Sequence, residues 1–202
     1  MASQKSVPFI YKLYQLFRIL STLVYFSLVM RWMVLFPLVG TKFLPGGIHE
    51  YLCYSMVLCS IGEFLLSLKF HGFIGGLCSA TSLKDFNFLY FVFVMHYYDD
   101  YEFAQVLKSA AYSAFILGLG FSQAYCHWCN LFKGIKRRKF GIVWKFMTYL
   151  MLPLLYISEF YLLLLNVQNP SFHSTPLLDL FNKVVLVLFL PVALSFYRNQ
   201  HF

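Results

Sequence analysis

The residues best suited to chemistry in this 202-residue chain are histidines and carboxylates near the ends of long apolar segments. Imidazole and carboxylate groups held on two sides of a pocket are the usual general acids and bases of enzymes. Several lie at positions where a helix would bring them to one edge of a bundle. The candidates for such an acid–base site are His49, Glu50, His96, Asp99 and Glu159.

Metal binding by the same edge is a second possibility, because His49, His96 and His173 accompany several acidic residues there. No ligand spacing such as His-Glu-x-x-His is present. A hydrated, tyrosine-rich ring of interfacial side chains is the simpler interpretation. The Cys126-x-x-Cys129 motif lacks the other ligands of a zinc site, and the five cysteines fit packing roles. The sequence therefore predicts no metal and no cofactor.

The composition shows which elements must position these residues. Apolar residues make up 60% of the chain, aromatic residues 21% and charged residues only 12%, whereas soluble domains are about 25% charged. A soluble enzyme, a nucleic-acid-binding domain and a disordered regulator are excluded, because a water-facing surface cannot be assembled from this composition. The predicted fold class is an all-α membrane protein, a polytopic bundle forming one domain over residues 1–202.

Six apolar segments are long enough to be transmembrane helices. The third contains the shortest apolar run, so a re-entrant segment is an alternative there. A turn over Leu44–Glu50 is expected before the second segment. With six spans and both termini cytosolic, most bases face the cytosol, Arg18 and Lys84 included, as the positive-inside rule requires. The predicted spans cover residues 19–39, 50–68, 82–98, 109–131, 141–165 and 177–197.

Ionisable side chains inside the bilayer need partners. Arg31 and Glu159 lie at similar depths from the luminal side, so we expect an intramembrane ion pair between them. Glu63 lies nearer the cytosolic side, where it reaches Lys69 or Lys84, or extends to the interface. Similar sequences around Glu63 and Glu159 would fit the inverted repeat of a transporter, which is the weakest of the functional alternatives.

Small residues recur every four positions in the fourth segment, and such a stripe lets another helix approach closely. That helix would belong either to this chain or to a partner protein. The stripe consists of Ala110, Ala114, Gly118, Ser122 and Cys126.

Several longer strings resemble one known family, the fungal Keg proteins, from about residue 10 to about residue 197. They include Phe36-Pro-Leu-Val-Gly-x-x-Phe-Leu-Pro-Gly-Gly-Ile-His49-Glu50, Phe70-His71-Gly-Phe, Tyr98-Asp99-Asp100-Tyr101-Glu102, Gln123-Ala-Tyr-Cys126-His127-Trp128-Cys129, Ile157-Ser-Glu159-Phe-x-Leu-Leu-Leu-Leu-Asn166 and His173-Ser-Thr-Pro176.

The resemblance implies an accessory protein of the endoplasmic reticulum membrane that binds a Kre-type glycoprotein and is needed for cell-wall β-1,6-glucan. It implies no catalytic motif, no cofactor and no nucleic-acid partner. Besides membrane lipids, the expected partner is a type II membrane glycoprotein with one helix and a luminal domain. We expect Ala110, Ala114 and Gly118 to contact its helix. Its luminal domain would contact Asp99, Asp100 and Glu102. The alternative is an intramembrane enzyme that modifies a lipid or glycolipid at the acid–base site.

Overall fold

The computed structural model describes residues 9–77, 79–97, 105–131, 141–168 and 176–199, and every element within them is a helix. All six predicted apolar segments lie in helices over most of their length. The elements are α1 (Phe9–Leu77), α2 (Ala80–Val92), the π-helix η1 (Phe93–Tyr97), the 3₁₀ helix η2 (Gln105–Lys108), α3 (Ala110–Leu131), α4 (Ile142–Phe146), the π-helix η3 (Met147–Met151), α5 (Leu152–Gln168) and α6 (Pro176–Asn199).

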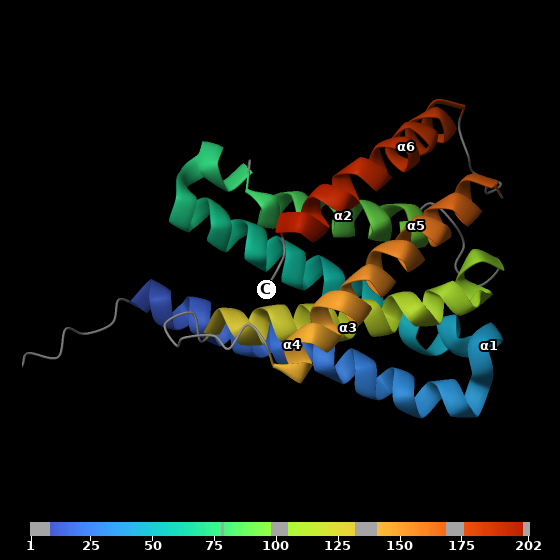
Figure 1. Cartoon of the computed structure of the whole chain (residues 1–202), viewed down its shortest axis with the longest axis horizontal. Helices are drawn as coiled ribbons and strands as arrows, with labels where there is room; N and C mark the ends of the chain where they lie inside the picture. Colours follow the sequence, from blue (N-terminus) through green and yellow to red (C-terminus); the bar gives the residue numbers. More distant parts are fainter. Residues whose placement is uncertain (1–8, 78, 98–104, 132–140, 169–175, 200–202) are drawn as a thin grey trace, which may run out of the picture.

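Helix α1 consists of two long limbs that fold back on each other (Figure 1). The chain reverses at Gly40, whose φ of 66° and ψ of −174° lie outside the helical region. A positive φ suits glycine because it has no Cβ. The predicted turn over Leu44–Glu50 is therefore wrong. These residues are helical, and Pro45 lies inside the second limb, five residues after Gly40.

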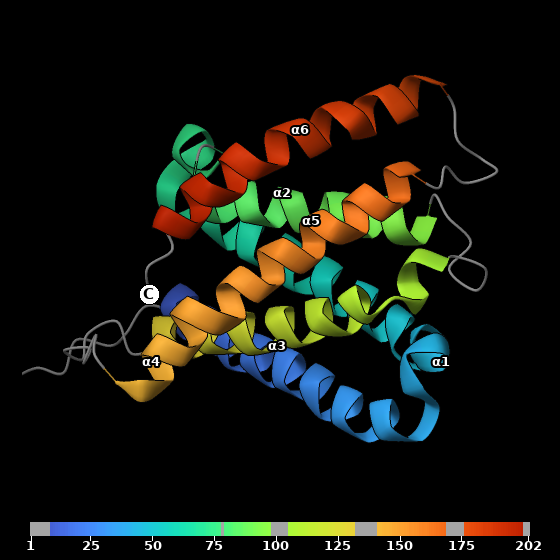
Figure 2. The same cartoon turned by 45° about the vertical axis from the view of Figure 1, so that its right-hand side comes forward.

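The long helices lie side by side with roughly aligned axes, and α6 forms one edge of the bundle (Figure 2). Helix α3 is central, since it packs against both α1 and α5. When the two limbs of α1 are counted separately, successive long helical segments begin at alternate ends of the bundle, and α1 begins at the end where α6 finishes (Figure 1).

Close helix approach in the centre depends on two glycines of α3. A Cβ on Gly118 would lie 2.7 Å from the backbone nitrogen of Leu155 in α5. A Cβ on Gly120 would lie 2.4 Å from the Val29 side chain in α1. The small-residue stripe is thus used inside the molecule at Gly118, and the expectation that a partner helix packs there is wrong. Ala110 is exposed and Ala114 is half-buried.

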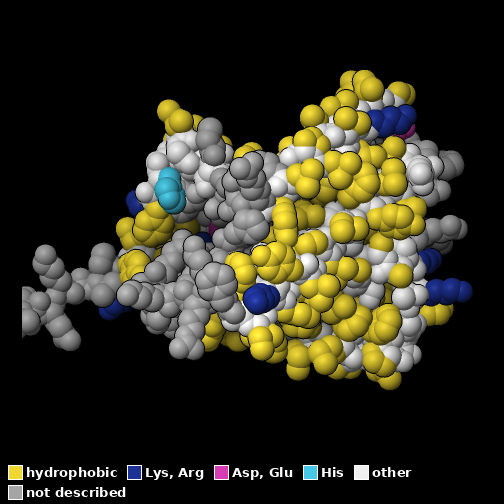
Figure 3. All heavy atoms as spheres, in the orientation of Figure 1, with side chains coloured by type: hydrophobic (Ala, Val, Ile, Leu, Met, Phe, Trp, Pro, Cys, Tyr) yellow, Lys and Arg dark blue, Asp and Glu magenta, His cyan; other side chains and the backbone are white. Residues whose placement is uncertain are grey.

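The surface is largely hydrophobic, as the yellow side chains in Figure 3 show. Large apolar residues are exposed on every long helix, among them Leu38 at 75%, Ile74 at 80% and Val187 at 74%, while the central α3 exposes Trp128 at 53%. Two helical stretches are long and apolar enough to cross a membrane, namely Ile10–Leu77, which is interrupted at Gly40 and Gly72, and Ile142–Gln168. A soluble monomer rarely exposes apolar patches this extensive, so the surface suits hydrocarbon.

Candidate functional site

Polar side chains gather inside the bundle in two places. We use the name charged cluster for Arg18, Glu63, Lys84, Asp85, Gln123 and His127. We use the name histidine cluster for His49, Cys53, His96 and Tyr112. Both clusters take residues from α1, from the continuous helix α2–η1 and from α3.

Glu63 is the centre of the charged cluster, because each of its oxygens accepts from a different cation. Arg18 Nη1 lies 2.6 Å from Glu63 Oε1, and Lys84 Nζ lies 2.8 Å from Glu63 Oε2. The exposed fractions of these three side chains are only 4–7%. Of the alternatives for Glu63, the structure selects Lys84, while Lys69 is exposed.

Neighbouring polar groups complete the charged cluster. Lys84 Nζ also donates to Gln123 Oε1 at 3.2 Å and lies 3.6 Å from Asp85 Oδ1. Arg18 Nη1 lies 2.8 Å from Nδ1 of His127. A guanidinium can only donate, so His127 Nδ1 accepts and its ring proton lies on Nε2. The His127 ring stacks on Tyr25, with an interplanar angle of 13°.

This arrangement indicates a structural role for the charged cluster. Two basic and two acidic side chains are removed from solvent together, so the ion pairs offset much of the desolvation penalty. Arg18 and Lys84, predicted among the cytosolic bases, are instead buried between helices. On one side of the cluster, Arg18 and Glu63 line a cavity of about 220 Å³, with Tyr14, Ser67 and His71 among the other lining residues.

The histidine cluster joins three helical stretches without an acidic residue among its four members. Nδ1 of His49 lies 2.9 Å from the hydroxyl of Tyr112, and its Nε2 lies 3.6 Å from Sγ of Cys53. The rings of His49 and His96 have centroids 5.3 Å apart. His49 and Cys53 are buried and His96 is half-buried. One ligand atom from each of these three residues lies within 4.8 Å of the others.

Only part of the predicted acid–base site comes together. His49 and His96 are adjacent, but the Glu50 residue is exposed. Glu159 accepts a hydrogen bond from Asn87, which precedes His96 by about 13 Å along the continuous helix α2–η1. Asp99, Asp100 and Glu102, predicted as a catalytic and docking segment, lie outside the described residues, as does His173.

The predicted Arg31–Glu159 ion pair is wrong for this structure. Glu159 is fully buried, and its Oε1 accepts from Nδ2 of Asn87 at 2.6 Å. Arg31 is exposed, with its guanidinium 5.4 Å from the centroid of the Tyr51 ring. Equal depth in the sequence did not bring the two side chains to facing sides of their helices.

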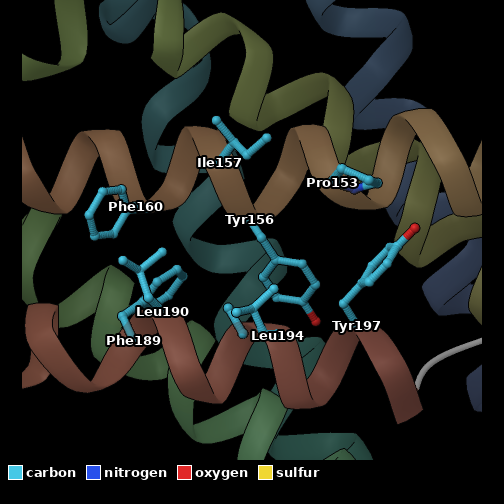
Figure 4. A pocket seen from close by; sticks show the side chains of 9 residues that line it. Pro153, Tyr156, Ile157, Phe160, Phe189, Leu190, Leu194 and Tyr197 are labelled. Carbon is cyan, nitrogen blue, oxygen red and sulfur yellow. The ribbon is translucent and has the colours of Figure 1, made fainter.

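An apolar groove runs between α5 and α6 (Figure 4). Its cavity volume is about 320 Å³. Tyr156 and Phe160 point from α5 toward α6, and Leu190 and Leu194 point back from α6. The groove is lined by Pro153, Tyr156, Ile157, Phe160, Phe189, Leu190, Ala193, Leu194 and Tyr197.

Besides Asp85 of α2, and Arg18, which was counted only among the cytosolic bases, sequence reasoning missed four members of the two clusters as site residues, namely His127, Gln123, Cys53 and Tyr112. The signal for Cys53 was present, because His49 and Cys53 are four residues apart and so share one helix face. The other three are polar residues on the fourth predicted segment, and their partners depend on which face of that helix meets α1.

An apolar helical surface around a buried charged interior is typical of a helical membrane protein. No family model and no solved structure matches the chain. A Saccharomyces cerevisiae protein named "Beta-1,6-glucan synthesis-associated protein KEG1" is 54% identical over 191 residues, which is 94% of each chain. The chain belongs to the fungal Keg family, which confirms the resemblance read from its sequence.

Proposed function

We propose that this protein is a non-catalytic accessory subunit of the endoplasmic reticulum membrane. In this role it binds and stabilises a Kre-type type II membrane glycoprotein for β-1,6-glucan synthesis and cell-wall biogenesis. The observation that carries the proposal is the 54% identity, over nearly the whole chain, to a protein named for association with this synthesis. The buried charged cluster supports it, because ion-paired groups stabilise a bundle and are not poised to react.

The proposed topology has six spans and cytosolic termini. Helix ends that alternate between the two ends of the bundle support it (Figure 2). The third segment forms one continuous helix, Ala80–Tyr97, with 13 α-helical and five π-helical residues. At 1.5 Å per residue such a helix is about 27 Å long, close to the hydrocarbon thickness of about 30 Å. This length favours a full crossing over a re-entrant segment.

For the partner's transmembrane helix we propose the α5–α6 groove in place of Gly118. Tyr156, Phe189 and Ala193 are buried in the groove. Ile157 and Leu194 are exposed at 67% and 69%. A largely apolar groove between two bilayer-length helices fits the apolar side chains of a single-span partner.

The Leu194→Trp variant tests this surface, because the larger side chain fills the groove. We expect recovery of the partner glycoprotein to fall at least about fivefold, which corresponds to roughly 1 kcal/mol of binding free energy. Leu38→Trp, an equally exposed site on α1, is the matched control and keeps wild-type recovery. The docking site would be refuted if both variants recovered the partner glycoprotein equally. If Leu194→Trp alone also lost a co-purifying lipid, the groove would be a lipid site.

The functional test is replacement of the yeast relative. Cells depleted of that protein and supplied with this chain should restore alkali-insoluble β-1,6-glucan in the wall, and the Leu194→Trp variant should restore less. Normal membrane levels of this chain without any restoration of glucan would contradict the proposed role.

A lipid- or glycolipid-modifying enzyme is the alternative function, and the adjacency of His49 and His96 is the observation that favours it. An acid–base mechanism requires these imidazoles, so the double variant His49→Gln/His96→Gln would abolish turnover of a lipid substrate. The accessory role predicts that this variant, where it reaches normal levels, still supports glucan synthesis.

A further inference from the structure

The histidine cluster has the donor set of a transition-metal site, and it is independent of the proposed partner binding. We propose that His49, Cys53 and His96 bind a divalent metal ion of the zinc class. Imidazole nitrogen and thiolate sulfur are the ligands that zinc prefers in proteins. Sequence spacing alone gave no such prediction, because the third ligand comes from a different helix.

The distances fit a shared ion. Zinc bonds of about 2.0 Å to nitrogen and about 2.3 Å to sulfur put tetrahedral ligand atoms about 3.5 Å apart. His49 Nε2 and Cys53 Sγ are 3.6 Å apart. All three ligand atoms lie within 4.8 Å of one another. A shift of about 1 Å in the His96 side chain brings the three ligand atoms to the spacing of three corners of a tetrahedron. His96 also lies in the π-helix η1, and π-helical turns are frequent at functional sites.

Tyr112 acts as a positioning residue for this site. Its hydroxyl is 2.9 Å from Nδ1 of His49. When that nitrogen carries the proton, Nε2 presents its lone pair toward Cys53. Metal-bound histidines usually have such an outer hydrogen bond, which fixes the tautomer and the ring orientation.

Ion binding changes the protonation of one ligand. Cys53 loses its thiol proton to solvent and binds as thiolate, while both histidines bind as neutral imidazoles. The ion then connects the second limb of α1 with the end of the α2–η1 helix. Because the folded site holds the ion and an unfolded chain does not, binding stabilises this end of the bundle.

The test uses the full chain, purified in mild detergent through a tag without histidines. We expect about one zinc per chain by elemental mass spectrometry after incubation with Zn²⁺ and removal of excess ion. Titration with Co²⁺ should produce a near-ultraviolet thiolate-to-cobalt charge-transfer band. Cys53→Ser should abolish the band and weaken Zn²⁺ binding at least about 100-fold, and Tyr112→Phe should weaken binding about tenfold.

Cys59→Ser is the matched control, since Cys59 is also buried in α1 but lies outside the cluster. It should keep the cobalt band and wild-type zinc content. A chelator should lower the melting temperature of the wild type and of Cys59→Ser, and leave Cys53→Ser unchanged. Wild-type protein with less than about a tenth of an ion per chain and no cobalt band would overturn the proposal. The same conclusion would follow if Cys53→Ser bound zinc as tightly as Cys59→Ser.

Discussion

The charged cluster and the histidine cluster draw on the same three helical stretches, about 20 Å apart along them, but their chemistry differs. In the charged cluster every strong interaction joins a basic side chain to an acidic or hydrogen-bonding one within the chain. The histidine cluster brings nitrogen and sulfur lone pairs together without an acidic side chain. The comparison indicates two roles for buried polar groups in such a bundle. Opposite charges stabilise the fold, whereas nitrogen and sulfur ligand atoms that point to one place suit a bound metal ion.

The largest expected effect comes from removing the centre of the charged cluster. Glu63→Ala leaves Arg18 and Lys84 buried without their carboxylate, which should lower the free energy of unfolding by about 3–5 kcal/mol. Thermal unfolding in detergent micelles measures this loss. Glu50→Ala, at an exposed carboxylate of the same helix, should change the stability by less than about 0.5 kcal/mol. Equal melting temperatures for the two variants would refute the structural role of the cluster.

A smaller loss is expected from Gly118→Ala, which affects the packing of α3 around both clusters. The new methyl would meet the Leu155 backbone at 2.7–2.8 Å, so α3 and α5 must separate. Overpacking of this kind costs about 1–3 kcal/mol. Gly46→Ala is the control, because a methyl there has nothing within 4 Å. Unchanged stability of Gly118→Ala, or loss of partner binding without loss of stability, would restore the partner-helix interpretation of the stripe.

Removing one hydrogen bond from the histidine cluster should cost less than removing Glu63. Tyr112→Phe deletes the hydroxyl beside His49 Nδ1, and the loss of one such bond is worth about 1 kcal/mol. The measurement is the same unfolding experiment, performed on metal-stripped protein so that ion binding does not contribute. A loss as large as that of Glu63→Ala would remove the contrast between the clusters.

The smallest effect is expected for Arg31→Gln. Arg31 is exposed and its guanidinium lies over the Tyr51 ring, so the stability should change by less than about 0.5 kcal/mol. The ion pair with Glu159 that the sequence suggested would make the same substitution cost several kcal/mol. Unfolding of Arg31→Gln beside wild type therefore decides between the two arrangements.

The success of the sequence analysis depended on whether a feature was local. Helix positions follow from runs of apolar residues, and the predicted segments agree with α1–α6 over most of their length. The reversal at Gly40 was assigned instead to the Pro45-Gly-Gly stretch, because both stretches contain turn residues and only packing decides between them. The interaction of Glu63 with Lys84 was among the expected alternatives, since both residues were assigned to the cytosolic side.

Contacts between helices were harder to predict, because they depend on how each helix is rotated about its axis. Equal depth in the membrane suggested that Arg31 forms an ion pair with Glu159. The orientation of α5 about its axis instead turns Glu159 toward Asn87. For the same reason His127 was not recognised as a site residue. It lies within the Cys126-x-x-Cys129 motif, and only the cysteines of that motif were considered. Gly118 was recognised as a site of close approach, but the sequence did not show that α5 would be the helix that approaches.

We propose that this protein acts as an accessory subunit of β-1,6-glucan synthesis. The most direct measurement is purification of the tagged protein at native abundance in mild detergent, followed by quantitative mass spectrometry of what accompanies it. The account predicts a near-stoichiometric single-span glycoprotein with a hydrolase-like luminal domain. Recovery of this protein alone, with a defined lipid retained and turned over, would contradict the account and favour an enzyme that uses His49 and His96.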